Sequence, residues 1–77
     1  MNQQQKKRLK EISATIETLK SEVDDIRNEE QDKQDNTPDN LQDGERYAQR
    51  EEAISYLDDS ISNLEDFVTN IENIDSI

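Results

Sequence analysis

The chain has 77 residues, of which 20 are Asp or Glu and 9 are Lys or Arg, so its formal net charge is −11. This length accommodates one small domain. The sequence contains no His and no Cys, so it lacks the usual general base, the thiol nucleophile and the common zinc ligands. We therefore expect a non-enzymatic protein with no catalytic residues, no metal and no cofactor.

Charge is divided unevenly between the two halves of the chain. Residues 1–34 hold 7 basic and 8 acidic side chains, whereas residues 35–77 hold 2 basic and 12 acidic ones. Such an acidic surface repels nucleic acid and anionic lipid and attracts basic protein surfaces. No run approaches the roughly 18 apolar residues of a membrane span, and no apolar stretch follows the basic residues near the start. We expect a cytoplasmic protein whose partner presents a basic surface.

The first predicted helix covers residues 3–34. Its large apolar side chains alternate at intervals of three and four residues, and they are Leu9, Ile12, Ile16, Leu19, Val23 and Ile26. This is a heptad pattern, with positions lettered a to g, in which these side chains occupy a and d. No Gly or Pro precedes Pro38 to interrupt the helix.

A connector is predicted over residues 35–44, which contain the only Pro and the only Gly of the chain. We expect Thr37 to cap a short helical turn, and Asp43 or Gly44 to cap the helix that follows.

The tip of the connector has two interpretations. Asn40, Leu41 and Gln42 form either a recognition tip or a well-built turn in which Leu41 covers the end of the bundle. The acidic side chains here are candidate contacts for a partner, namely Asp39, Asp43 and Glu45.

The second predicted helix covers residues 45–75 and repeats the spacing of the first with Ile54, Leu57, Ile61, Leu64, Val68 and Ile71. When the two helices are paired antiparallel, facing apolar residues have numbers that sum to 80, as Ile26 and Ile54 do. The same register predicts an ion pair between Glu30 and Arg50. Residues 1–77 are therefore expected to form a single all-α fold, a two-helix antiparallel coiled-coil hairpin.

The two edges of this hairpin differ in chemistry. At position e the first helix offers mainly basic side chains and the second offers acids, so this edge is predicted to close by ion pairs. The other edge of the second helix is partly apolar. There we expect Tyr56, Phe67 and Ile74 to pack against a second copy in a homodimeric four-helix bundle, or against a target protein. The alternative is that they are half-buried residues of a monomer.

Acidic pairs open each heptad of the second helix, so carboxylates recur about every 10.5 Å along it. The first acid of each pair is at e and faces the first helix, and the second is at f and faces solvent. This repeat is either an acidic partner-binding face or an ordinary solvated face of a coiled coil. The candidate residues are Glu52, Asp58, Asp59, Glu65 and Asp66.

The connector carries a resemblance to a group of short acidic helical-hairpin proteins of Gram-positive bacteria and their phages. The pattern is Asn-x-Pro-x-Asn-Leu-Gln-x-x-Glu-Arg-Tyr, which runs here from Asn36 to Tyr47 and is followed by acidic heptads. The resemblance covers about residues 20–75 and implies a helical hairpin with no established activity. It also implies a phage or prophage origin, where small acidic proteins often block host nucleases, and this step is an analogy.

Two hypotheses for the function follow. In the first, the protein is an inhibitor of the anti-CRISPR or anti-restriction type, whose acidic face occupies the basic nucleic-acid-binding surface of a CRISPR effector or another host nuclease. In the second, it is a structural or assembly module that oligomerises, and its acidity serves only solubility.

Overall fold

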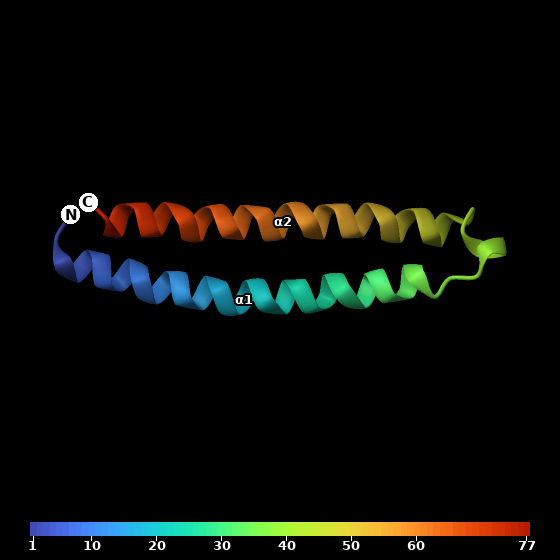
Figure 1. The fold of residues 1–77 in the computed structure, drawn as a ribbon, viewed down its shortest axis with the longest axis horizontal. Coiled ribbons are helices and arrows are strands. Elements are labelled where there is room, and N and C mark those ends of the chain that lie inside the picture. Colours follow the sequence, from blue (N-terminus) through green and yellow to red (C-terminus); the bar gives the residue numbers. More distant parts are fainter.

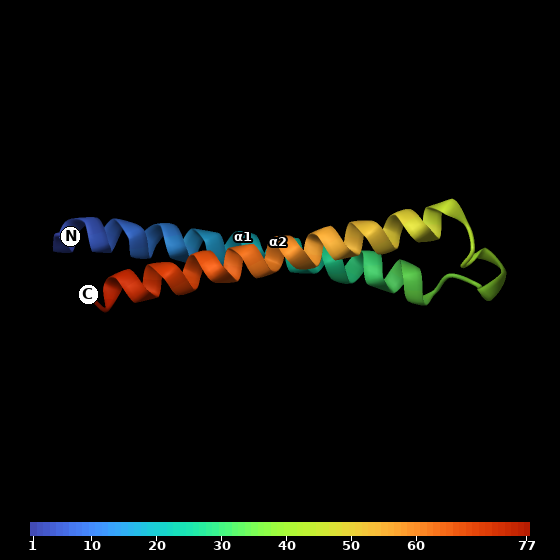
Figure 2. The same cartoon turned by 90° about the horizontal axis from the view of Figure 1, so that it is seen from above.

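In the computed structural model, which describes all 77 residues, two long helices lie side by side and antiparallel (Figure 1). Helix α1 runs over Gln3–Asp35, a 3₁₀ turn η1 over Asp39–Leu41, and helix α2 over Glu45–Asp75. The molecule is a rod of 59 × 15 × 14 Å with both termini at one end. The predicted all-helical hairpin is confirmed, and Figure 2 shows the helices crossing at a shallow angle near the middle of the rod.

Helix α1 begins with a capping box that the sequence pattern of apolar residues did not reveal. The backbone N–H of Gln5 donates to Oδ1 of Asn2 at 2.7 Å, and the backbone N–H of Asn2 donates to Oε1 of Gln5 at 3.3 Å. Two of the N–H groups at the start of the helix are thereby satisfied. The basic segment that follows is helical from its first residues.

The connector differs from its prediction at two residues. The hydroxyl of Thr37 donates to the carbonyl of Lys33 at 2.7 Å, so Thr37 completes α1 instead of capping η1, whose N-cap is Pro38. Leu41 is 56% exposed, so the prediction that it covers the end of the bundle is wrong.

Of the two predicted caps for α2, Gly44 occupies the N-cap position. A Cβ atom at Gly44 would lie 3.2 Å from the carbonyl oxygen of Leu41. The close turn between η1 and α2 therefore favours a residue without a side chain.

The apolar seam between the helices is narrower than the heptad pattern predicted. On α2, Ile54 and Val68 are 8% exposed and form its centre. On α1 the position a residues are half-buried. Its position d residues, by contrast, are exposed to 47%, 45% and 51% in the order Ile12, Leu19 and Ile26. Their predicted place within the seam is therefore wrong.

The polar residues at position e of α1 take the place of this row. Lys20 and Arg27 are half-buried and Gln34 is 4% exposed, because each bonds to α2. A seam of positions a and e implies that α1 is turned about its own axis by roughly 50° from an a and d seam. The predicted Glu30–Arg50 ion pair is absent as well, since Glu30 pairs with Lys33 at 2.7 Å.

Candidate protein-binding surfaces

The first edge of the hairpin is closed by charge, as predicted. Nε of Arg27 donates to Oδ1 of Asp58 at 2.8 Å, and Nζ of Lys20 lies 3.3 Å from Oε1 of Glu65. Asp58 and Glu65 are thus engaged by α1, although about half of each side chain remains exposed. Of the candidate acids, these two have part of their charge compensated within the hairpin.

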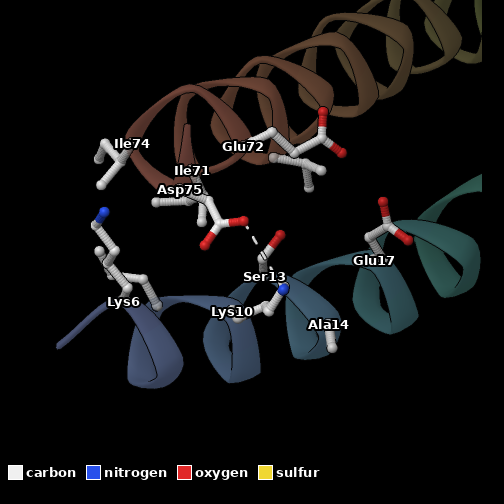
Figure 3. A pocket seen from close by; sticks show the side chains of 11 residues that line it. Lys6, Lys10, Ser13, Ala14, Glu17, Ile71, Glu72, Ile74 and Asp75 are labelled. Atoms are coloured by element: carbon white, nitrogen blue, oxygen red, sulfur yellow. Dashed lines mark ion pairs between the residues drawn. The ribbon is translucent and has the colours of Figure 1, made fainter. Parts of the chain in front are cut away.

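This edge opens near the termini, where Ser13 stands at position e and has no charged side chain to bridge the helices. A hollow of about 250 Å³ lies there, with Leu9 and Ile71 among its lining residues. Figure 3 shows Lys10 and Asp75 approaching each other across the hollow, and their charged atoms are 3.8 Å apart. Charges of both signs surround it, so it does not select a ligand of one charge.

The acids at position f form the most uniformly charged surface of the molecule. Glu52, Asp59 and Asp66 are exposed, and none of them makes an ion pair or a side-chain hydrogen bond. Residues 51–77 contain 8 acidic and no basic side chains, so no cation on the same stretch of helix compensates them. This row is called the acid ladder below.

The structure adds a fourth carboxylate to the acid ladder. Because α2 begins at Glu45, this residue is one heptad before Glu52 and also occupies position f. The sequence interpretation placed Glu45 with the loop acids. The ladder therefore extends from Glu45 to Asp66, which is about 31 Å at 1.5 Å per residue.

The other two loop acids lie in the connector, beyond the end of the ladder. Oδ1 of Asp39 accepts a hydrogen bond from Gln42 at 3.3 Å, whereas Asp43 is exposed and makes neither an ion pair nor a side-chain bond. Beside them is a wide hollow whose lining includes three basic residues, namely Lys33, Arg46 and Arg50. The connector is consequently a surface of mixed charge.

The second edge of the hairpin is apolar and uncovered. Tyr56 is 65% exposed and Phe67 is 37% exposed. Ile74, which was predicted to lie with them, is half-buried and lines the hollow near the termini. The exposed position d residues of α1 add to the apolar area outside the seam. Sequence reasoning missed this contribution because it assigned that row to the seam. The sequence did contain a signal for this rotation of α1. Lys20 and Arg27 at position e have side chains long enough to reach the acids of α2 across the seam.

Neither a metal site, nor a membrane-spanning stretch, nor a similar known protein assigns a role to these surfaces. No group of three acidic side chains lies close enough to hold a metal ion, and neither long helix has a stretch apolar enough to cross a membrane. Comparison with known protein families, curated proteins and solved structures gives no match. The acid ladder and the apolar edge are thus interpreted from their chemistry alone.

Proposed function

We propose that this protein is a non-enzymatic binding module that places its acid ladder in the basic groove of a nucleic-acid-binding protein. The observation that carries the proposal is the row of exposed carboxylates at position f of α2, of which Glu52, Asp59 and Asp66 make no ion pair and no side-chain hydrogen bond. A stiff row of this kind presents its charges at fixed intervals, so binding does not require the side chains to be gathered from a flexible chain.

The acid ladder places one carboxylate every seven helical residues, which is about 10.5 Å along the rod. A groove that holds a phosphate backbone is lined with basic side chains. Successive carboxylates can therefore each meet a basic side chain of such a groove. The net charge of −11 adds long-range attraction toward such a groove.

The class of partner comes from the resemblance described above and not from the geometry. It points to a host defence nuclease, such as a CRISPR effector or a restriction enzyme, as the owner of the basic groove. The module would then be a phage or prophage inhibitor that acts in the bacterial cytoplasm and excludes the nucleic acid from its site.

The proposal is tested with the triple variant E52Q/D59N/D66N, which removes three ladder charges at nearly constant side-chain size. Partners are captured from bacterial lysate on the immobilised protein and eluted with rising salt or with duplex DNA. Affinity of the purified partner is then measured at several salt concentrations. We expect the variant to bind at least about tenfold more weakly at low salt, with a shallower salt dependence, and we expect duplex DNA to compete.

The matched control is S55A/S62A/T69A, three changes at position b on the same helix, which should leave affinity and salt dependence unchanged. If the triple variant of the ladder binds as the native protein does, the acid ladder is not the binding surface and the proposal is wrong.

A second candidate function is favoured by the uncovered apolar edge. In this alternative the protein is an assembly module that forms a homodimeric four-helix bundle through Tyr56, Phe67 and Ile74, and the acids provide solubility. Light scattering would then give twice the monomer mass of 9.0 kDa. Tyr56→Ala and Phe67→Ala should lower that mass, whereas the ladder variant should leave it unchanged.

A further inference from the structure

The uncovered apolar edge is formed by residues of both helices, and not by α2 alone. The position e residues of the two helices face each other across the ion-pair edge, as Lys20 and Glu65 do. Position d of α1 and position g of α2 must therefore lie together on the opposite edge. This surface is called the open face, and its residues are Ile12, Leu19, Ile26, Ala53, Ser60 and Phe67. Ile74 also occupies position g, but it lines the hollow near the termini and is not counted with them.

The hairpin exposes more surface than a folded monomer of its mass usually does. Its accessible surface is 5936 Å², whereas a compact protein of 9.0 kDa has about 4,900 Å². The excess is roughly 1,000 Å². A standard protein interface buries about 800 Å² on each partner, so one partner on the open face is enough to remove most of it.

We infer that a second copy of the chain covers the open face, with the two α1 helices antiparallel and a two-fold axis at Leu19. This inference rests on the self-association proposed above and specifies its geometry. In this arrangement Leu19 packs on Leu19 of the other copy. Ile12 packs on Ile26 of the other copy, and the same contact is repeated by symmetry.

Charge along α1 favours this orientation. Residues 1–10 hold four basic and no acidic side chains, and residues 21–35 hold 7 acidic and 2 basic ones. Antiparallel pairing places each basic segment beside the acidic segment of the other copy, whereas parallel pairing would place segments of the same charge beside each other. At position g, Arg8 then faces Glu29 of the second copy. Neither residue makes an ion pair within its own hairpin.

The acidic helix α2 is compatible with the same axis. Bonds between the helices join residues whose numbers sum to 81–85, and the three ion pairs each sum to 85, so residues 65–66 of α2 lie beside Leu19 along the rod. About that point, Phe67 of one copy falls between Ser60 and Phe67 of the other, which places its apolar ring close to the two-fold axis.

No acid of α2 faces the second copy in this arrangement. The eight acids of residues 51–77 are at positions e and f, except Asp75 at position a, and position g holds none. The acid ladder at position f stays on the outer side of each hairpin. The dimer consequently carries two ladders, and both remain free to bind a basic partner.

Single cysteines test the geometry without background, because the native chain contains no Cys. We expect Leu19→Cys to form a disulfide-linked dimer under mild oxidation, at least about tenfold faster than Asp59→Cys on the outer side. Ile12→Cys and Ile26→Cys should cross-link to each other when the two variants are mixed, in preference to cross-linking with themselves.

Charge exchange provides a second test that leaves the apolar residues intact. Arg8→Glu should weaken the dimer about tenfold at low salt, since it turns two attractive contacts into repulsive ones. Adding Glu29→Arg should restore it. The two positions are about 31 Å apart on one α1 helix, so the restoration can only report a contact between copies. Circular dichroism checks that each variant keeps its helices.

The outcomes separate the geometry from self-association itself. A mass of 9.0 kDa by light scattering at micromolar concentration overturns both. A dimer in which Leu19→Cys cross-links to Ser60→Cys of the other copy, and not to itself, keeps self-association and overturns the antiparallel α1 pairing. Failure of Glu29→Arg to restore the Arg8→Glu dimer does the same.

Discussion

Gln34 donates a hydrogen bond from its side-chain Nε2 to the backbone carbonyl oxygen of Tyr47 at 3.0 Å, and it is the most buried residue of the hairpin. Its Oε1 also lies 3.4 Å from the guanidinium of Arg50. The bond joins position e of α1 to the first turn of α2, next to the connector. It therefore fixes the rotation of α1 at the end where the chain reverses. The ion pairs of Arg27 and Lys20 further along α1 require the same rotation, because they too join position e to α2.

The first prediction concerns this bond. Gln34→Ala should lower the free energy of unfolding by about 1–2 kcal/mol, because it removes a buried donor and leaves a small void. In a domain of this size that corresponds to a fall in Tm of roughly 5–10 °C, measured by circular dichroism. Gln31→Ala is the matched control, since Gln31 bonds only to the exposed Asp35 one turn away. Equal effects of the two substitutions would contradict a special role for Gln34.

The hairpin could be predicted from the sequence, and the physical reasons are clear. Twelve large apolar residues fall on two helical stripes, and the only Pro and Gly lie between them. The predicted bounds of residues 3–34 and 45–75 differ from the observed helices by one residue, at the end of α1. Ion pairing at position e was also predictable, because oppositely charged rows on facing helices have few other partners.

The rotation of α1 was not predictable from apolar spacing alone. A heptad pattern assigns Leu19 and its neighbours at position d to the seam, because it counts only hydrophobic burial. Gln34 and Arg27 compete for the same space with hydrogen bonds of defined length and direction. Their long apolar stems also contribute to packing. Which row enters the seam depends on this balance, and the balance requires the positions of atoms on α2.

The acid ladder was partly predictable as well. Its three central carboxylates follow from the heptad letters. Glu45 follows from them as well, since the predicted helix already began at residue 45, but the sequence interpretation grouped Glu45 with the connector acids. The structure places Glu45 in the first turn of α2, directly after the N-cap Gly44.

The second prediction is a coupling between Arg27 and Asp58. A double-mutant cycle with Arg27→Ala and Asp58→Ala should give a coupling energy of about 0.5–1 kcal/mol at low salt. In 1 M salt the coupling should fall, since both side chains are partly exposed and screening is then strong. The measurement is denaturant unfolding of the four proteins at two salt concentrations. A coupling near zero at low salt would show that the pair does not hold the rotation of α1.

The third prediction separates the two apolar rows. Ile54→Ala should cost about 2–4 kcal/mol, because Ile54 is at the centre of the seam. Ile12→Ala should cost less than about 1 kcal/mol in dilute solution where the chain is monomeric, because roughly half of Ile12 is already exposed to water.

These two substitutions delete the same atoms, so they are controls for each other. The unrotated heptad seam would make Ile12 and Ile54 nearly equivalent, and equal losses in denaturant unfolding would favour that seam. If Ile54→Ala unfolds the hairpin, Ile54→Val gives a smaller loss of about 0.5–1.5 kcal/mol that remains measurable.

The fourth prediction distinguishes a ladder kept for binding from one kept for folding. The carboxylates of Glu52, Asp59 and Asp66 make no stabilising bond in the hairpin, and they lie among other acids on a stretch of helix with no basic residue. Neutralising them in E52Q/D59N/D66N should therefore leave Tm unchanged or raise it by a few degrees, as mutual repulsion is relieved. Thermal unfolding at low salt measures this, and the rise should shrink when salt is added. Partner binding should weaken in the same protein, so stability and affinity change independently or in opposite directions. A clear fall in Tm would instead assign these acids to the stability of α2 and remove the argument that their charge is free for a partner.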